Sequence, residues 1–203
     1  MPNKSSNLDR RIRKSQKSLK DALLTLMQTK DFKNISITDI VRLADLNRGT
    51  FYKHYQDKEE LLAEIIDEVI KDLTISYRAP YENLTEFEMS KLTASAIKIF
   101  EHVEAHANFY TLLGKSNILT GLQTRVCDEL IQLISHDLSN NLINTKINAK
   151  LIASYQAYAI WGMITEWVDS EFSYPTSYMA EQLLEILHQR PILDKHSIQN
   201  LPD

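Results

Sequence analysis

The sequence predicts an all-α protein with an N-terminal three-helix domain of the helix-turn-helix kind and a C-terminal helical bundle. The 203 residues include only 4 Gly and 5 Pro, whereas β-rich folds need many turn residues. Apolar residues recur at spacings of three, four and seven through most of the chain. The charge is also divided. Residues 1–60 carry 13 Lys and Arg against 8 Asp and Glu, a net charge of +5, and residues 61–203 carry 10 against 19, a net charge of −9.

This division of charge indicates a nucleic-acid partner, because a basic domain attracts phosphate while an acidic body is repelled by it. The single cysteine, Cys127, excludes a disulfide within one chain and fits a reducing compartment. Residues 1–13 lack the apolar stretch of a signal peptide, and no apolar run is long enough to span a membrane. We therefore expect a cytoplasmic protein without a membrane segment.

The N-terminal part is expected to begin with a disordered arm over residues 1–8, followed by a helix from Asp9 to about Thr29. Ser36 is a good N-cap for a second helix, with Asp39 at the third helical position, near the positive helix end.

A third helix, residues 48–55, follows a three-residue connection and is expected to be capped by Asn47. Two short helices joined in this way form a helix-turn-helix, in which the first helix sets the angle of the second and the second enters the major groove. The second helix must then be apolar on one side and rich in donors on the other. Phe51 and Tyr55, four residues apart, supply the apolar side. The polar side comprises Arg48, Thr50, Tyr52, Lys53 and His54.

Asp57, with Glu60 three residues on, predicts a capping box at the start of a long helix over 58–79, which Pro80 ends. The remaining helices are predicted near 85–106, 108–113, 118–139, 146–170 and 177–189, with breaks at Gly114, Gly121, Asn140-Asn141 and Pro175.

Residues 35–62 resemble the DNA-binding signature of the TetR family of transcriptional regulators, of the TetR/AcrR type. Its core is Gly49-Thr-Phe-Tyr-Lys-His-Tyr55, followed by Asp57-Lys-Glu-Glu-Leu61, and the ungapped resemblance runs from about Arg11 to Ile66. Many members have Gly where this chain has Asp45, and Asp can adopt the same left-handed conformation. The resemblance implies a DNA-binding domain over 9–57 and a ligand-sensing and dimerisation domain over 58–203.

The resemblance also implies which residues contact DNA, namely Ser36, Thr38, Arg48, Gly49, Thr50, Tyr52, Lys53, His54 and Lys58. Arg48 would reach a base edge, and Thr38, Tyr52 and Lys58 would hold phosphates. Simpler interpretations stay open: Arg48 and Lys53 as solvated charges, His54 as a structural hydrogen-bonder, and Tyr52 as packing.

The C-terminal part resembles the regulatory domain of the same family more loosely, in residues 109–113 and 155–167. The resemblance implies a homodimer through helices near 149–170 and 177–189, which suits a palindromic operator. It also implies a pocket for a small apolar or aromatic effector. The candidate lining residues are Phe100, Phe109, Tyr110, Tyr158, Trp161 and Met163. Each of them could equally be an ordinary core residue.

His102 and His106 lie four residues apart, a spacing that can hold zinc if further ligands such as Cys127 arrive from elsewhere. Ordinary histidines are the simpler interpretation, so neither a metal nor a cofactor is predicted. Phosphate-binding glycine loops, nucleophile elbows and metalloprotease motifs are absent from the sequence, which argues against an enzyme. The expected function is a sequence-specific repressor of transcription that binds double-stranded DNA and is released by a small-molecule inducer. Two alternatives are a coactivator of the same fold without its own operator, and a DNA-binding regulator without a ligand.

Overall fold

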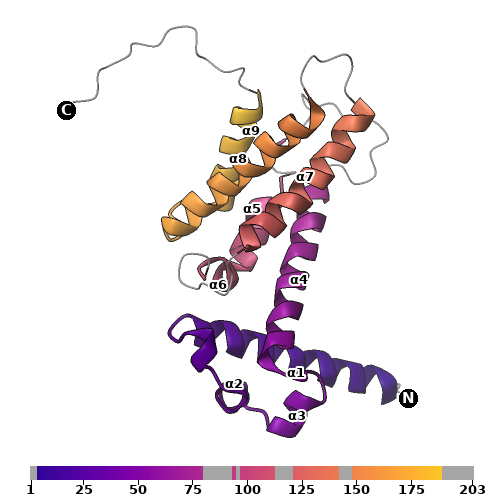
Figure 1. Cartoon of the computed structure of the whole chain (residues 1–203), viewed down its shortest axis with the longest axis vertical. Coiled ribbons are helices and arrows are strands. Elements are labelled where there is room, and N and C mark those ends of the chain that lie inside the picture. The colour runs from indigo at the N-terminus through magenta and orange to yellow at the C-terminus, as the bar shows by residue number, and fades with distance from the viewer. Residues whose placement is uncertain (1–3, 80–92, 95–96, 113–120, 142–147, 189–203) are drawn as a thin grey trace, which may run out of the picture.

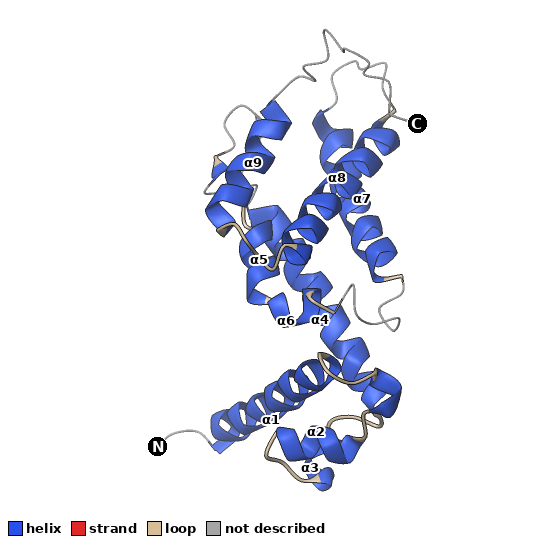
Figure 2. Cartoon of the chain, turned by 90° about the vertical axis from the view of Figure 1, so that its left-hand side faces the viewer, coloured by secondary structure: helices blue, strands red, loops and turns tan. Residues whose placement is uncertain are grey.

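The computed structural model describes residues 4–79, 93–94, 97–112, 121–141 and 148–188. Within these residues, every regular element is a helix, and Figure 2 shows only helices and loops there. No helix among them is both long and apolar enough to cross a membrane. The all-α fold class is thus confirmed.

The N-terminal part, here called the head, is built from four helical elements gathered around the lower end of a second long helix (Figure 1). They are α1 (Lys4–Met27), the 3-10 helix η1 (Phe32–Asn34), α2 (Ile37–Leu43) and α3 (Arg48–Tyr52). The long helix is α4 (Lys58–Arg78), close to the expected span 58–79.

Helix α1 begins at Lys4, so the expectation of a disordered arm over residues 1–8 is wrong for residues 4–8. The sequence from Lys4 to Arg10 contains neither Gly nor Pro. Nothing in this segment therefore interrupts the helix before its first buried positions, Leu19 and Ala22.

The N-caps of the head helices are confirmed. Ser36 Oγ accepts a hydrogen bond from the Asp39 amide at 3.1 Å, and Asp39 Oδ2 accepts one from the Ser36 amide at 3.1 Å, which completes a capping box. Asp57 Oδ1 accepts from the Glu60 amide at 2.7 Å. The return bond differs from the expected box, because Glu60 Oε2 accepts from the Gln56 amide at 2.6 Å rather than from the cap residue itself.

The C-terminal part, here called the body, comprises α5 (Ile99–Ala105), α6 (Ala107–Tyr110), α7 (Leu122–Asn141), α8 (Ala149–Asp169) and α9 (Thr176–His188). The predicted helix over 85–106 is too long, because Ile97 and Lys98 are not helical; residues 85–92 lie outside the described part of the chain. The predicted end of the helix over 118–139 lies within two residues of the observed one, since α7 ends at Asn141. Gly114 lies outside the described residues.

One hydrophobic core runs from the head into the body, and α4 belongs to both. Near its start, α4 is tied to α1, since Lys20 Nζ lies 2.7 Å from Glu64 Oε1 and 2.6 Å from Glu68 Oε1. Further along, Asp67 pairs with Arg125 of α7 at 2.8 Å. Any movement of α4 is therefore transmitted to both parts.

Candidate nucleic-acid interface

The turn between α2 and α3 is fixed by a left-handed residue at Asp45, whose φ is 55°. The Leu46 amide then donates to the Val41 carbonyl at 2.8 Å, which closes the end of α2. This confirms the expected conformation of Asp45. The turn sets the angle between α2 and α3.

The inner side of α3 is aromatic. Phe51 is fully buried and Tyr55 nearly so, and their ring centroids lie 5.7 Å apart. Regular α-helix ends at Tyr52 instead of the predicted Tyr55. The amides of His54 and Tyr55 nevertheless both donate to the Phe51 carbonyl, at 2.9 and 3.0 Å, so Tyr55 still faces inward.

The outer side of α3 is polar and accessible. Arg48 and Lys53 are exposed, and Tyr52 keeps 51% of its surface in solvent. Arg48 Nη2 donates to Tyr52 Oη at 3.3 Å, and its guanidinium lies 5.9 Å from the Tyr52 ring centroid. The two side chains one turn apart therefore orient each other on the outer face. The Tyr52 ring also meets Phe51 edge-on at 5.6 Å, so the packing interpretation holds for one edge of the ring only.

The N-cap of α3 restricts which residue fits at position 49. Asn47 Oδ1 accepts from the Thr50 amide at 2.8 Å, and a Cβ at Gly49 would lie 3.2 Å from that same oxygen. A larger residue would therefore push against the cap. Thr50 is half-buried, and its Oγ1 lies 3.2 Å from the same Asn47 oxygen.

Lys58, the first residue of α4, is held by the backbone of the head. Its Nζ donates to the carbonyls of Phe32 at 2.7 Å, Ile35 at 2.7 Å and Lys33 at 3.2 Å, and it sits 4.6 Å from the Phe32 ring centroid. An ammonium has three donors, and here all three point at the backbone around η1. Lys58 thus anchors the start of α4 to the head rather than presenting its charge to solvent.

The other three candidates lie at the start of α2 and just after α3. Ser36 is exposed, but its Oγ is occupied by the capping box, with Asp39 Oδ2 at 2.8 Å. Thr38 is exposed. His54 is half-buried beside the Tyr55 ring, 6.2 Å between centroids.

The six candidate pocket residues occupy different environments. Phe100, Phe109, Tyr110 and Trp161 lie in the hydrophobic core, and Met163 packs against its edge. Tyr158 is exposed on α8 because it follows Leu151 by seven residues and Tyr155 by three, which places all three on one outer face. A cleft of about 380 Å³ lies between α1 and α4. Its described lining residues are Arg13, Gln16, Lys17, Lys20, Asp21, Leu24, Ile65, Glu68, Val69 and His106, and they include none of the six.

His102 and His106 come together with Asp72 of α4, and not with Cys127, in the described part of the chain. Cys127 is buried, and burial together with the nearby Asp128 carboxylate raises the pKa of its thiol to about 11. Sequence reasoning missed Asp72. Its only signal is a carboxylate on the inner side of α4, which no local pattern links to α5.

A short helix with a buried aromatic side and an exposed polar side, set by a tight turn against a capped helix, defines a helix-turn-helix DNA-binding protein. Two family models match the chain: "Bacterial regulatory proteins, tetR family" over residues 19–65 and "Transcriptional regulator C-terminal region" over residues 90–189. The chain belongs to the TetR family of transcriptional regulators. Members of this class act by binding DNA and are not enzymes.

Individual relatives agree with this assignment. The uncharacterized HTH-type transcriptional regulator YxbF of Bacillus subtilis is 29% identical over 191 residues, which cover 91% of this chain and 47% of YxbF. The chain thus spans about half the length of that relative. The dhaKLM operon transcriptional activator DhaS of Lactococcus lactis is 37% identical over 59 residues, 29% of this chain and 32% of DhaS.

Solved structures share the fold. A putative TetR-family regulator from Syntrophomonas wolfei superposes with a TM-score of 0.66 at 20% identity, covering 86% of this chain and 93% of its own. NalD, the secondary repressor of the MexAB-OprM multidrug efflux pump in Pseudomonas aeruginosa, superposes with a TM-score of 0.56 at 17% identity, covering 87% and 96%.

Proposed function

We propose that this chain is a ligand-responsive regulator that binds its operator as a homodimer, and that it represses transcription until an effector releases it. The observation that carries the proposal is the outer face of α3. There Arg48, Tyr52 and Lys53 are all exposed, while Phe51 holds the helix to the core.

In this proposal residues 9–57 form the DNA-binding domain and residues 58–203 form the effector and dimerisation domain. Arg48 reads a base edge, most simply guanine, because its guanidinium can donate two parallel hydrogen bonds. Tyr52, Lys53 and Thr38 contact phosphates, and Gly49 and Thr50 lie close to the DNA backbone. Lys58 positions the head on α4 instead of contacting a phosphate, since its donors are used.

The proposed dimer uses the outer faces of α8 and α9. Leu151 and Tyr155 on α8 are 67% and 75% exposed, and Tyr178 and Ile186 on α9 are also exposed. Contiguous apolar side chains in solvent mark an interaction surface, and a two-fold dimer presents two α3 helices to a palindromic site. The apolar residues of α9 face in two directions. Leu183 is buried in the core of its own chain, and Ile186 points outward.

Release follows from the position of α4, which is bonded to α1 through Lys20 and to α7 through Arg125. An effector that binds one arrangement of the body better than another shifts the spacing of the two heads and lowers operator affinity by the difference in its two affinities. The cleft between α1 and α4 is lined by charged side chains together with the apolar Leu24, Ile65 and Val69. Its lining therefore suits an effector with both apolar and charged groups.

The test is a fluorescence-anisotropy titration of the full chain against DNA from just upstream of its own gene, at two salt concentrations. We expect tight, salt-sensitive binding that Arg48→Ala weakens by about 1–3 kcal/mol, which is a roughly 5- to 150-fold rise in Kd. Arg78→Ala, which removes the same charge at the exposed end of α4, serves as the control and should bind as the wild type does. Weak binding that is equally salt-sensitive in all three proteins would favour a coactivator of the same fold.

The direction of regulation needs its own measurement, because NalD is a repressor and DhaS an activator. A reporter driven by the bound promoter should rise when the gene for this chain is deleted. A reporter that falls would make the chain an activator.

A further inference from the structure

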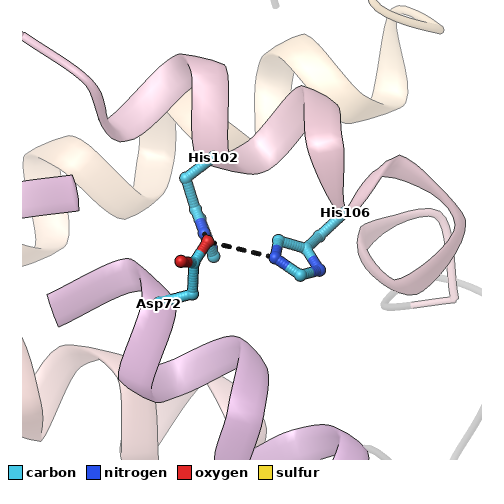
Figure 3. A group of neighbouring side chains, drawn as sticks. All are labelled: Asp72, His102 and His106. Atoms are coloured by element: carbon cyan, nitrogen blue, oxygen red, sulfur yellow. Dashed lines mark hydrogen bonds and ion pairs between the residues drawn. The ribbon is translucent and has the colours of Figure 1, made fainter. Parts of the chain in front are cut away.

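Asp72, His102 and His106 form a compact group at the junction of α4 and α5, shown in Figure 3. His102 Nδ1 lies 2.7 Å from Asp72 Oδ2, and His106 Nε2 lies 3.1 Å from the same oxygen. One ligand atom from each residue lies within 4.8 Å of the other two. Two imidazole nitrogens and one carboxylate oxygen therefore converge on one point.

The backbone fixes this convergence. His102 and His106 are one helical turn apart, and the His106 amide donates to the His102 carbonyl at 3.0 Å. Their ring centroids are 4.7 Å apart. Asp72 projects from α4 towards both rings, as Figure 3 shows.

We propose that Asp72, His102 and His106 bind a first-row divalent transition-metal ion such as Zn²⁺. Imidazole and carboxylate are the ligands these ions take, at about 2.0–2.2 Å from the metal. Ligand atoms at those distances around a tetrahedral ion are about 3.4 Å apart. The observed separations of 2.7 and 3.1 Å then have to widen by less than about 1 Å.

A second layer of contacts prepares His102 for this role. His102 is buried, and its Nε2 lies 2.9 Å from Tyr110 Oη. Metal-binding histidines are commonly oriented by a hydrogen bond at the other ring nitrogen. With an ion on Nδ1, the Nε2–H donates to Tyr110 Oη.

The site is partly open to solvent. The side chains of Asp72 and His106 are 47% and 31% exposed, and His106 lines the cleft between α1 and α4. An ion can therefore enter without unfolding the core. Three protein ligands leave a coordination position for water or a small molecule.

The site also suits an effector, an extension that rests on the proposed function. Asp72 lies one turn beyond Glu68, the residue that binds Lys20 of α1. Metal–ligand bonds, which are shorter, would replace the two hydrogen bonds between Asp72 and the histidines and would hold α4 against α5. Metal occupancy would thus bias the orientation of α4, and with it the head.

The site is tested without DNA, by titrating Co²⁺ into the full chain freed of metal with a chelator. We expect one Co²⁺ per chain, with visible absorption from coordinated nitrogen and oxygen. His106→Gln and Asp72→Asn should each weaken Co²⁺ binding at least tenfold, the low end of the loss caused by removing an outer-shell partner. His136→Gln, which removes an exposed histidine from α7, is the matched control and should bind as the wild type does.

Circular dichroism of each variant establishes that it is folded. The proposal is overturned if the wild type shows no saturable Co²⁺ binding, or if both folded variants bind Co²⁺ as tightly as the wild type. The effector extension is read separately from operator affinity with and without Zn²⁺. Operator binding that Zn²⁺ leaves unchanged overturns the extension alone, whereas an absence of operator binding overturns the proposed function and leaves the Co²⁺ result standing.

Discussion

The head and the body assemble their candidate functional residues differently. In the head, the side chains proposed to meet DNA lie close together in sequence, most of them between Arg48 and His54, and local bonds position them. In the body, Asp72 reaches His102 across 30 residues and His106 across 34. A site built from one short segment leaves a signature in the sequence, whereas a site built from two helices emerges only when the chain folds.

The largest effect should come from the residue that joins the outer face of α3 to the core. Phe51 is fully buried, so Phe51→Ala is expected to cost about 3–5 kcal/mol of unfolding free energy through lost burial and a cavity. Urea denaturation followed by circular dichroism measures this, and operator binding should fall with the stability of the head.

The matched control for Phe51→Ala is its neighbour, since Tyr52 is 51% exposed. Tyr52→Ala should leave the unfolding free energy nearly unchanged and still weaken operator binding. Normal operator affinity in Tyr52→Ala would refute the proposed phosphate contact and leave Tyr52 as packing. Together, the two variants separate the inner from the outer side of one helix.

In the body, by contrast with Phe51 in the head, an exposed residue is expected to determine assembly of the dimer. Tyr155 is 75% exposed, so Tyr155→Asp should leave the folded monomer intact but place a charge in the proposed dimer interface, where an unpaired buried charge costs several kcal/mol. Light scattering on a size-exclusion column should show a monomer where the wild type is a dimer. Lys71→Gln, an exposed change on α4, is the control. A Tyr155→Asp protein that remains dimeric would exclude this face.

Lys58 tests where the head ends and α4 begins. Its ammonium donates to three carbonyls around η1, and a hydrogen bond from a charged group contributes about 1.5–3 kcal/mol. Lys58→Met is therefore expected to destabilise the protein by about 1–3 kcal/mol. The salt dependence of operator binding should stay the same. A lost phosphate contact would instead lower the slope of log K against log salt by about one. A stable Lys58→Met variant with a lower slope would restore the phosphate role that the family resemblance implies.

Lys58 also shows how far the sequence can be interpreted. The caps at Ser36, Asn47 and Asp57 were predictable, because each acts on an amide two or three residues away. The target of Lys58 was not, because the Phe32 carbonyl lies 26 residues earlier. Asp72 was missed for the same reason. The end of α7 was predicted to within two residues, because Asn140 and Asn141 are of a residue type that favours turns.

The smallest effect is expected at Asp45, where the head departs from the family's usual glycine. Its φ of 55° strains most side chains, but Asp tolerates it. Asp45→Gly removes the residual strain but adds freedom to the unfolded chain, so its net effect should be below about 1 kcal/mol. Asp45→Ala keeps the strain without the tolerance of Asp and should destabilise by about 1 kcal/mol. Urea denaturation of the three proteins should therefore give Gly and Asp similar stabilities, both above Ala. An Asp45→Ala variant as stable as the wild type would contradict the role of the left-handed turn in setting the angle between α2 and α3. The position of Arg48 would then depend on the packing of Phe51 and Tyr55 alone.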